Sequence, residues 1–429
     1  MQTLATDSEL GRHLLTIRGF HFIFGAQRDP YALLLRAESD DPHDLGRQIR
    51  DRGELYRSEA GAWVTAGHEM ATRLLRDSRL GLRHKGVQGV QQHVFQDVWD
   101  NPKLCHIVPL DAAFLNLEQE EYARLRLLSA PLLGTPGVDR YRRDVEDVFQ
   151  RLTDGLDGEF DLMTEVARKA AIAVVTELTD LPAQERDRFA QLCIGLDVAL
   201  DAGLCPPQLK TARRLLESID QVRELFTGVI AERHGEDRDD LISSLLRERG
   251  DDERATDDVL AICMLITVAG IEVTANLLCN ALAELLDHPE QWELLRQDRG
   301  LAPSAVRETL RYAPPVRLEN LIAHEDLELL GQQVPADSQV VLFLAAANRD
   351  LDVYPDPDRF DITRTANGNL SLSDDLPTGL IAPLAQLQAA VALQVVAERL
   401  PRIRRADEML RRMRSPVARG VLRFPATTA

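Results

Sequence analysis

Residues 308–316 read Glu-Thr-Leu-Arg-Tyr-Ala-Pro-Pro-Val, and residues 345–360 read Ala-Ala-Ala-Asn-Arg-Asp-Leu-Asp-Val-Tyr-Pro-Asp-Pro-Asp-Arg-Phe. In the first stretch, a spacing of three places Glu308 and Arg311 on one helical face, where the two side chains can pair. In the second, the prolines favour turns, so we interpret its aspartates as part of a solvated loop rather than a metal site. The two stretches in this order form the most specific pattern in the chain.

Helical periodicity dominates the sequence around these stretches. Leucines and valines recur at spacings of three and four before Pro401 and predict an amphipathic helix that this proline ends. Residues 259–286 are apolar on nearly every face and predict a helix that crosses a large core. Strand-like stretches are few, at 55–64 and 340–344. We therefore predict a mainly α fold with small β-sheets and, because no repeat or long linker divides the chain, a single domain over residues 1–429.

Charge and composition narrow the classes of function. The chain has 429 residues, with 50 Lys plus Arg against 69 Asp plus Glu, which gives a net charge of −19. Such a charge argues against nucleic-acid and anionic-membrane partners. We find no signal peptide, and the longest apolar run, 259–271, is shorter than the roughly 20 residues that span a bilayer. Five scattered cysteines, Cys105, Cys193, Cys205, Cys263 and Cys279, are typical of reduced thiols, and we expect a cytoplasmic protein.

The two quoted stretches resemble the Glu-x-x-Arg helix and the segment that follows it in bacterial cytochromes P-450. The resemblance covers essentially the whole chain and implies the fold of that family. In the family, an arginine of the later segment joins the Glu–Arg pair in a buried charge network. The resemblance places this arginine at Arg359, so Glu308, Arg311 and Arg359 are expected to form the network.

The loop that binds haem in this family is altered here. Bacterial members read roughly Phe-Gly-x-Gly-x-His-x-Cys-x-Gly, and the cysteine thiolate binds the iron. Residues 372–381 of this chain read Leu-Ser-Asp-Asp-Leu-Pro-Thr-Gly-Leu-Ile, which places Gly379 at the cysteine position. The resemblance therefore implies a P-450-like fold that lacks the haem-thiolate site. We expect no cofactor, no metal ligand and no catalytic residue.

Other parts of the haem machinery differ as well. The family carries Ala-Gly-x-acid-Thr in its central helix, and Val273 stands here at the threonine position. Of the His and Arg that pair with the haem carboxylates, Tyr122 replaces the first while Arg126 is kept. A further arginine is replaced by Leu321, and residues 374–375 are two aspartates that would repel those carboxylates. Losses in four separate segments indicate a dismantled site.

The N-terminal 50 residues resemble a narrower branch of the family. The matching motifs are Gly11-Arg12-His13-Leu14, Ile17-Arg18-Gly19-Phe20-His21, Gly25, Asp29-Pro30-Tyr31 and Asp40-Asp41-Pro42-His43. They are similar to the opening of haem-free auxiliary proteins encoded in macrolide and anthracycline gene clusters, which bind and activate deoxysugar glycosyltransferases. The resemblance implies a non-catalytic activator that stabilises a nucleotide-deoxysugar glycosyltransferase in antibiotic biosynthesis, in a complex with two copies of each chain.

The surface that contacts such a partner is less specific in the sequence. Phe20, Phe22 and Phe24 form an aromatic cluster that would anchor an interface if exposed and would belong to the core otherwise. Two other functions stay open. One is a small-molecule protein that holds an aglycone in the former substrate cavity, which dialysis would detect. The other is a P-450 enzyme with an unconventional haem ligand, which a Soret band would reveal.

Overall fold

The computed structural model describes residues 6–37, 42–83, 115, 117–250, 252–365, 368–374 and 376–428. The α-helices are α1 Asp7–Ala26, α2 Pro30–Arg36, α3 Pro42–Asp51, α4 His68–Leu75, α6 Gln119–Leu133, α7 Thr135–Val138, α8 Arg142–Thr153, α9 Arg168–Leu178, α10 Ala183–Ile194, α11 Leu209–Arg233, α12 Leu241–Arg249, α13 Ala255–Val268, α14 Gly270–Asp287, α15 Pro289–Gln297, α16 Ala302–Tyr312, α17 Leu344–Ala347 and α18 Ala382–Arg399. Short 3-10 or π turns are η2 Asp139–Tyr141, η3 Leu162–Ala167, η4 Arg299–Leu301 and η5 Pro377–Gly379. The strands are β1 Tyr56–Arg57, β2 Trp63–Thr65, β3 Leu80–Gly81, β4 Glu159–Asp161, β5 Leu318–Ala323, β6 Leu327–Leu329, β7 Gln332–Val334, β8 Gln339–Phe343, β9 Arg404–Arg405, β10 Leu410–Arg411, β11 Val421–Arg423 and β12 Pro425–Thr427.

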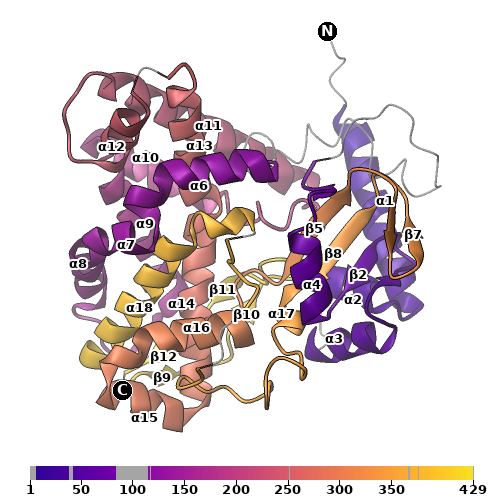
Figure 1. Ribbon diagram of the computed structural model, residues 1–429. Coiled ribbons are helices and arrows are strands. Elements are labelled where there is room, and N and C mark those ends of the chain that lie inside the picture. Colours follow the sequence, from indigo (N-terminus) through magenta and orange to yellow (C-terminus); the bar gives the residue numbers. More distant parts are fainter. Residues whose placement is uncertain are drawn as a thin grey trace.

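Helix α14 lies at the centre of the helical part of the molecule, with α9, α16 and α18 packed around it (Figure 1). Its side chains are buried on almost every face, and the buried set includes the polar Glu272, Thr274, Asn276 and Asn280 besides the apolar majority. The stretch Ala255–Asp287 is the one described segment long and apolar enough to cross a membrane, and its most apolar window of 18 residues is entirely buried inside the fold. The predicted core helix is thus confirmed in place and in burial.

The central helix is not continuous, in contrast to the prediction for residues 259–286. A break at Ala269, with φ −93° and ψ −44°, separates α13 from α14. The hydroxyl of Thr267 donates to the carbonyl of Cys263 at 2.8 Å, a back-bond that bends helices. The break lies where the family has its Ala-Gly motif, here Ala269-Gly270.

A five-stranded sheet lies beside the helical part, with α1 to α4 around it (Figure 1). Its strand order is β1-β2-β8-β5-β3, and only the β2–β8 pair in this sheet is parallel. The strands predicted at 55–64 and 340–344 are confirmed as β1, β2 and β8. Together with three smaller sheets this confirms the expected mainly α fold with little β structure.

The segment after α10 is tied to the C-terminal β10–β11 hairpin. The buried carboxylate of Asp201 accepts hydrogen bonds from the hydroxyl of Ser415 at 2.5 Å and from the backbone N–H groups of Val417 and Ala418 at 2.8 and 3.2 Å. Arg412 adds an ion pair to Asp197 at 2.7 Å. These contacts close the hairpin against the helical part.

Candidate functional site

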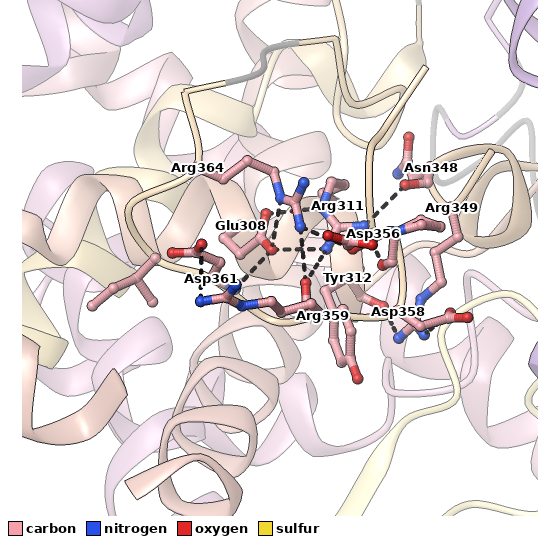
Figure 2. Close-up of polar contacts among 12 residues, drawn as sticks. Glu308, Arg311, Tyr312, Asn348, Arg349, Asp356, Asp358, Arg359, Asp361 and Arg364 are labelled. Carbon is pink, nitrogen blue, oxygen red and sulfur yellow. Dashed lines mark hydrogen bonds and ion pairs between the residues drawn. The ribbon is translucent and has the colours of Figure 1, made fainter. Parts of the chain in front are cut away.

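The predicted Glu–Arg pair connects α16 to the long loop that follows α17 (Figure 2). Both side chains are buried, and Arg311 donates to the two carboxylate oxygens of Glu308 at 2.7 and 2.8 Å. Arg311 also donates to the carbonyls of Pro357, Arg359 and Asn348 at 2.8, 3.0 and 3.3 Å. Two of these hydrogen bonds hold the carboxylate of Glu308 on α16 and three go to carbonyls of residues 348–359, so the pair joins the helix to the loop and has a structural role.

The third member of this network is Arg364, and the expectation of Arg359 is corrected. Nε of Arg364 lies 3.3 Å from Oε1 of Glu308, and its side chain is mostly buried. The guanidinium of Arg359 is 67% exposed and pairs with Asp361 at 3.7 Å (Figure 2). Arg359 contributes its carbonyl instead, because the loop directs its side chain outward.

The loop that would carry a haem ligand is closely packed around Gly379. A Cβ atom at this position would lie 2.5 Å from the carbonyl oxygen of Ser373 and 2.9 Å from Cα of Asp374. Both are backbone atoms, so any larger residue requires the loop to move. Arg126 donates to the carbonyl of Asp374 and lies 3.9 Å from its carboxylate, which holds the loop in this position. The neighbouring Asp375 is outside the described residues.

The central helix and α18 approach each other next to this loop. Ile381 stands where the family motif has its last glycine, and its Cγ2 lies 3.8 Å from the position of a Cβ on Gly270. The space left between Gly270, Thr274, Ile381 and Leu384 is about 10 Å³, which holds no more than one water molecule. Side chains therefore fill this part of the interior.

The acid of the central-helix motif, Glu272, is held in ion pairs. Its carboxylate lies 3.5 Å from Arg168 and 3.7 Å from Arg412, and it accepts a hydrogen bond from the amide of Asn276 at 2.9 Å. The adjacent Val273 is fully buried. These partners belong to α9, α14 and the C-terminal hairpin, so the carboxylate of Glu272 links these elements.

A residual cavity of about 310 Å³ lies between α4, α6, β5 and the loop at 374–380. Its lining includes Tyr122, Arg126, Leu321 and Asp374, which the sequence comparison had identified in three separate segments. Burial raises the pKa of the Tyr122 phenol well above its ordinary value, and the nearby Glu319 adds to the shift. The positions that face the haem carboxylates in the family therefore do meet at one cavity.

Comparison with known proteins identifies the family of this chain. A model described as Cytochrome P-450 matches residues 204–375. The chain is 48% identical to Protein AknT of Streptomyces galilaeus, over 99% of this chain and 97% of that protein, and 35% identical to Protein DesVIII of Streptomyces venezuelae, over 99% and 94%. It is also 31% identical to Cytochrome P-450 107B1 of Saccharopolyspora erythraea, over 91% and 95%. The chain belongs to the cytochrome P-450 family.

The fold agrees with this assignment. A crystal structure of ligand-free CYP164A2 from Mycobacterium smegmatis superposes with a TM-score of 0.77 at 28% identity and covers 93% of this chain and 99% of that one. P450BioI, in complex with a fatty-acid-loaded acyl carrier protein, superposes equally well at 26% identity, over 90% and 98%. The chain therefore has the cytochrome P-450 fold.

The aromatic cluster of this P-450 is divided between core and surface. Phe24 is buried, and the half-buried Phe20 stacks on it with ring centroids 6.1 Å apart. Phe22 is 57% exposed, with the guanidinium of Arg36 5.1 Å from its ring centroid. Leu15 and Ile23 of the same helix are also exposed. The sequence prediction missed Leu15, although its spacing of seven and eight from Phe22 and Ile23 places all three on one helical face.

The described cysteines, Cys193, Cys205, Cys263 and Cys279, are all buried, and burial raises the pKa of each thiol. Cys105 is outside the described residues. Among the residues that the structure describes, no group of three or more His, Cys, Asp or Glu side chains is placed to hold a metal ion. These thiols pack as small apolar groups.

Proposed function

We propose that this P-450 homologue is a haem-free, non-catalytic auxiliary protein that binds and stabilises a nucleotide-deoxysugar glycosyltransferase in antibiotic biosynthesis. The observation that carries the proposal is the match to AknT and DesVIII over 99% of this chain. Such a match includes the N-terminal 50 residues, whose motifs resemble the auxiliary branch. The match to Cytochrome P-450 107B1 covers 91% at lower identity. We place this chain in that branch, as a single cytoplasmic domain over residues 1–429.

The geometry around Gly379 supports the absence of haem. Glycine offers no ligand atom, and a cysteine here would collide with the backbone of Ser373 and Asp374. Arg126, which pairs with a haem carboxylate in the family, is engaged by Asp374. The residues present do not fit a haem bound through this loop, so haem takes no part in the proposed function.

A non-catalytic partner can still raise the rate of an enzyme. If the auxiliary protein binds only the active conformation of the glycosyltransferase, binding increases the population of that conformation by mass action. A differential affinity of about 5 kcal/mol shifts an equilibrium from 1:99 to 99:1. No residue of the auxiliary protein needs to touch the sugar or the acceptor.

We propose that the exposed apolar face of α1, made of Leu15, Phe22 and Ile23, contacts the partner. The three side chains are 70%, 57% and 51% exposed, and water is expelled from such a surface when a complementary face covers it. Phe24 is buried, and the half-buried Phe20 stacks on it within the same helix. Of the three phenylalanines, Phe22 is therefore the one assigned to the contact surface.

The deciding experiment measures turnover of the deoxysugar glycosyltransferase alone and with an equal concentration of this protein, with both samples analysed by size exclusion. We expect a large increase in rate and a shared elution peak. Unchanged turnover with separate peaks would contradict the proposal. Absorption spectra after expression with added haem serve as a control, since a Soret band would instead support an enzyme with an unconventional ligand.

Aglycone binding is a second candidate function, favoured by the residual cavity. At about 310 Å³ it lies at the lower end of the range for small-molecule pockets, and Leu321, Leu376 and Leu380 give it apolar walls. Equilibrium dialysis of the isolated protein against macrolactone and anthracyclinone aglycones tests it. Retention of an aglycone by the protein alone, without activation of a glycosyltransferase, would favour this function over the first.

A further inference from the structure

A second cavity, of about 190 Å³, opens between α3, α14, the end of α16 and the C-terminal hairpin, and it shares no lining residue with the residual cavity. Arginines dominate its charged lining: Arg317, Arg349, Arg411 and Arg419. His43 adds an imidazole, and Glu284 is the one carboxylate among the described lining residues. So many guanidiniums around one hollow are unexpected in a chain with a net charge of −19. We call this hollow the arginine cavity.

Arg411 is held firmly in the wall of the arginine cavity. Its Nη2 donates to Oδ1 of Asn280 at 2.9 Å, and its Nη1 donates to the backbone carbonyl of Arg419 at 3.1 Å. Both acceptors are neutral, so these bonds orient the guanidinium without cancelling its charge. Burial, together with the positive charges of Arg419 and Arg405, lowers the pKa of Arg411 to about 10.

Arg349 and Arg317 are oriented as well. The guanidinium of Arg349 lies 3.7 Å from the ring centroid of Tyr312 and donates to the carbonyl of that residue at 3.0 Å. Its ion pair is with Asp358, whose side chain is 69% exposed. Arg317 is buried, with its guanidinium 5.8 Å from the ring centroid of Phe343. Side chains fixed in this way lose little conformational entropy when a ligand binds.

One carboxylate, that of Glu284, stands against four guanidinium groups in the described lining. Burial raises the pKa of Glu284, and its Oε2 lies 4.0 Å from Nδ1 of His288, outside the lining. Positive groups gathered in a partly desolvated hollow repel one another, and an anion between them relieves that repulsion. The described lining is therefore arranged for a negatively charged ligand.

We propose that the arginine cavity binds an oxyanion of the phosphate class, either free phosphate and pyrophosphate or the diphosphate group of a nucleotide. Guanidinium groups are planar forks whose N–H donors match phosphate oxygens in pairs. Several arginines on different walls suit a multiply charged tetrahedral group better than a single carboxylate. The site is a property of this chain alone and does not depend on the proposed glycosyltransferase partner.

Isothermal titration calorimetry of the full chain with sodium pyrophosphate, inorganic phosphate and uridine diphosphate tests the site. We expect saturable binding of pyrophosphate that weakens between 50 and 500 mM KCl, because added salt screens the charges. Arg411→Gln should raise the pyrophosphate Kd about tenfold or more. Arg423→Gln is the matched control, since this arginine of the same hairpin is 62% exposed and pairs with Asp161; its Kd should stay within about twofold of wild type.

The nucleotide arm distinguishes the two sources of phosphate. Equal affinities for uridine diphosphate and pyrophosphate would show that the cavity contacts the phosphates alone. Tighter binding of uridine diphosphate would show that it contacts the nucleoside as well. Either result supports the proposed site. Circular dichroism verifies the fold of each variant, and Arg419→Gln replaces Arg411→Gln if the latter does not fold. Absence of binding for all three anions, or equal affinity in wild type and a folded cavity variant, would overturn the proposal, whatever the glycosyltransferase assay shows.

Discussion

Glu308 is the buried acceptor that, together with Arg311, joins α16 to the loop after α17. Its carboxylate accepts two hydrogen bonds from the guanidinium of Arg311, one from Nε of Arg364 and one from the backbone N–H of Asp361, at distances between 2.7 and 3.3 Å. A buried carboxylate is costly unless all its acceptor positions are satisfied. Arg311 belongs to α16 itself, whereas Asp361 and Arg364 belong to the loop, so the charge of Glu308 helps to fold the loop back onto the helix.

Replacing Arg364 with glutamine should lower the free energy of unfolding by about 1–3 kcal/mol, because Oε1 of buried Glu308 loses a charged donor while Arg311 remains. Arg359→Gln is the control, and it should change the free energy by less than about 0.5 kcal/mol because its side chain is exposed. Urea denaturation of both variants measures the difference. Equal losses in the two variants would contradict the assignment of Arg364 to the network.

The sequence predicts Glu308 and Arg311 but not Arg364, for a physical reason. Helical spacing determines which side chains share a face, and no such rule governs a loop with two prolines and a left-handed residue, Asp356 at φ 47°.

The aromatic cluster of α1 could be predicted in more detail from the sequence. Helical positions two apart point about 200° from each other, so Phe22 could have been placed opposite Phe20 and Phe24 from the sequence. Which of the two faces is exposed depends on neighbours that α1 meets only in the folded chain.

Between elements, Asp201 is the main polar link from the segment after α10 to the C-terminal hairpin. Burial raises its pKa to about 6, although hydrogen bonds from Ser415 and the amides of Val417 and Ala418 oppose the shift. Between its ordinary value near 4 and about 6, the folded chain therefore keeps a proton that the unfolded chain has released. The stability due to this group is complete below pH 4 and decreases as the pH rises to 6.

Asp201→Asn removes this titration while it keeps an oxygen for the two amides and an N–H group for Ser415. The free energy of unfolding of the wild type, relative to the variant, should therefore decrease by up to about 3 kcal/mol between pH 4 and pH 7. Guanidinium chloride denaturation of both proteins at pH 4.5, 5.5 and 6.5 measures this difference. A difference that stays constant with pH would show that Asp201 is ionised throughout.

The loop before α18 makes a second prediction at this scale. Gly379→Ala should lower the free energy of unfolding by about 1–3 kcal/mol, because its methyl group would meet the backbone of Ser373 and Asp374. Gly19→Ala in α1, where a Cβ meets nothing within 4 Å, should instead raise it by about 0.5–1 kcal/mol. Thermal melting followed by circular dichroism compares them. A neutral Gly379→Ala would mean that the loop has room for a side chain, and thus for a ligand.

Across the whole molecule, the features that determine the fold are those shared with the cytochrome P-450 family. The Glu308 network, the central helix and α18 keep the architecture of the family, as the TM-score of 0.77 to CYP164A2 shows. Beside Gly379, the side chain of Ile381 packs near Gly270 and Arg126 donates to the carbonyl of Asp374. A rigid framework with an apolar face on α1 is suited to hold a partner in one conformation, since little of it must be ordered on binding.

If α1 is that contact surface, Phe22→Asp should raise the concentration of this protein needed for half-maximal activation of the glycosyltransferase by roughly tenfold or more, because a carboxylate would be desolvated in the interface. The rate at saturation should change little, since the variant still selects the same active conformation once bound. Leu351→Asp controls for added charge at another exposed apolar residue, 76% exposed and outside α1. Titrating each variant against a fixed enzyme concentration gives both quantities. If both the half-maximal concentration and the saturating rate of Phe22→Asp are those of the wild type, the interface lies away from α1 and the activator function stands. If the half-maximal concentration is unchanged but the saturating rate is lower, α1 takes part in activation after binding.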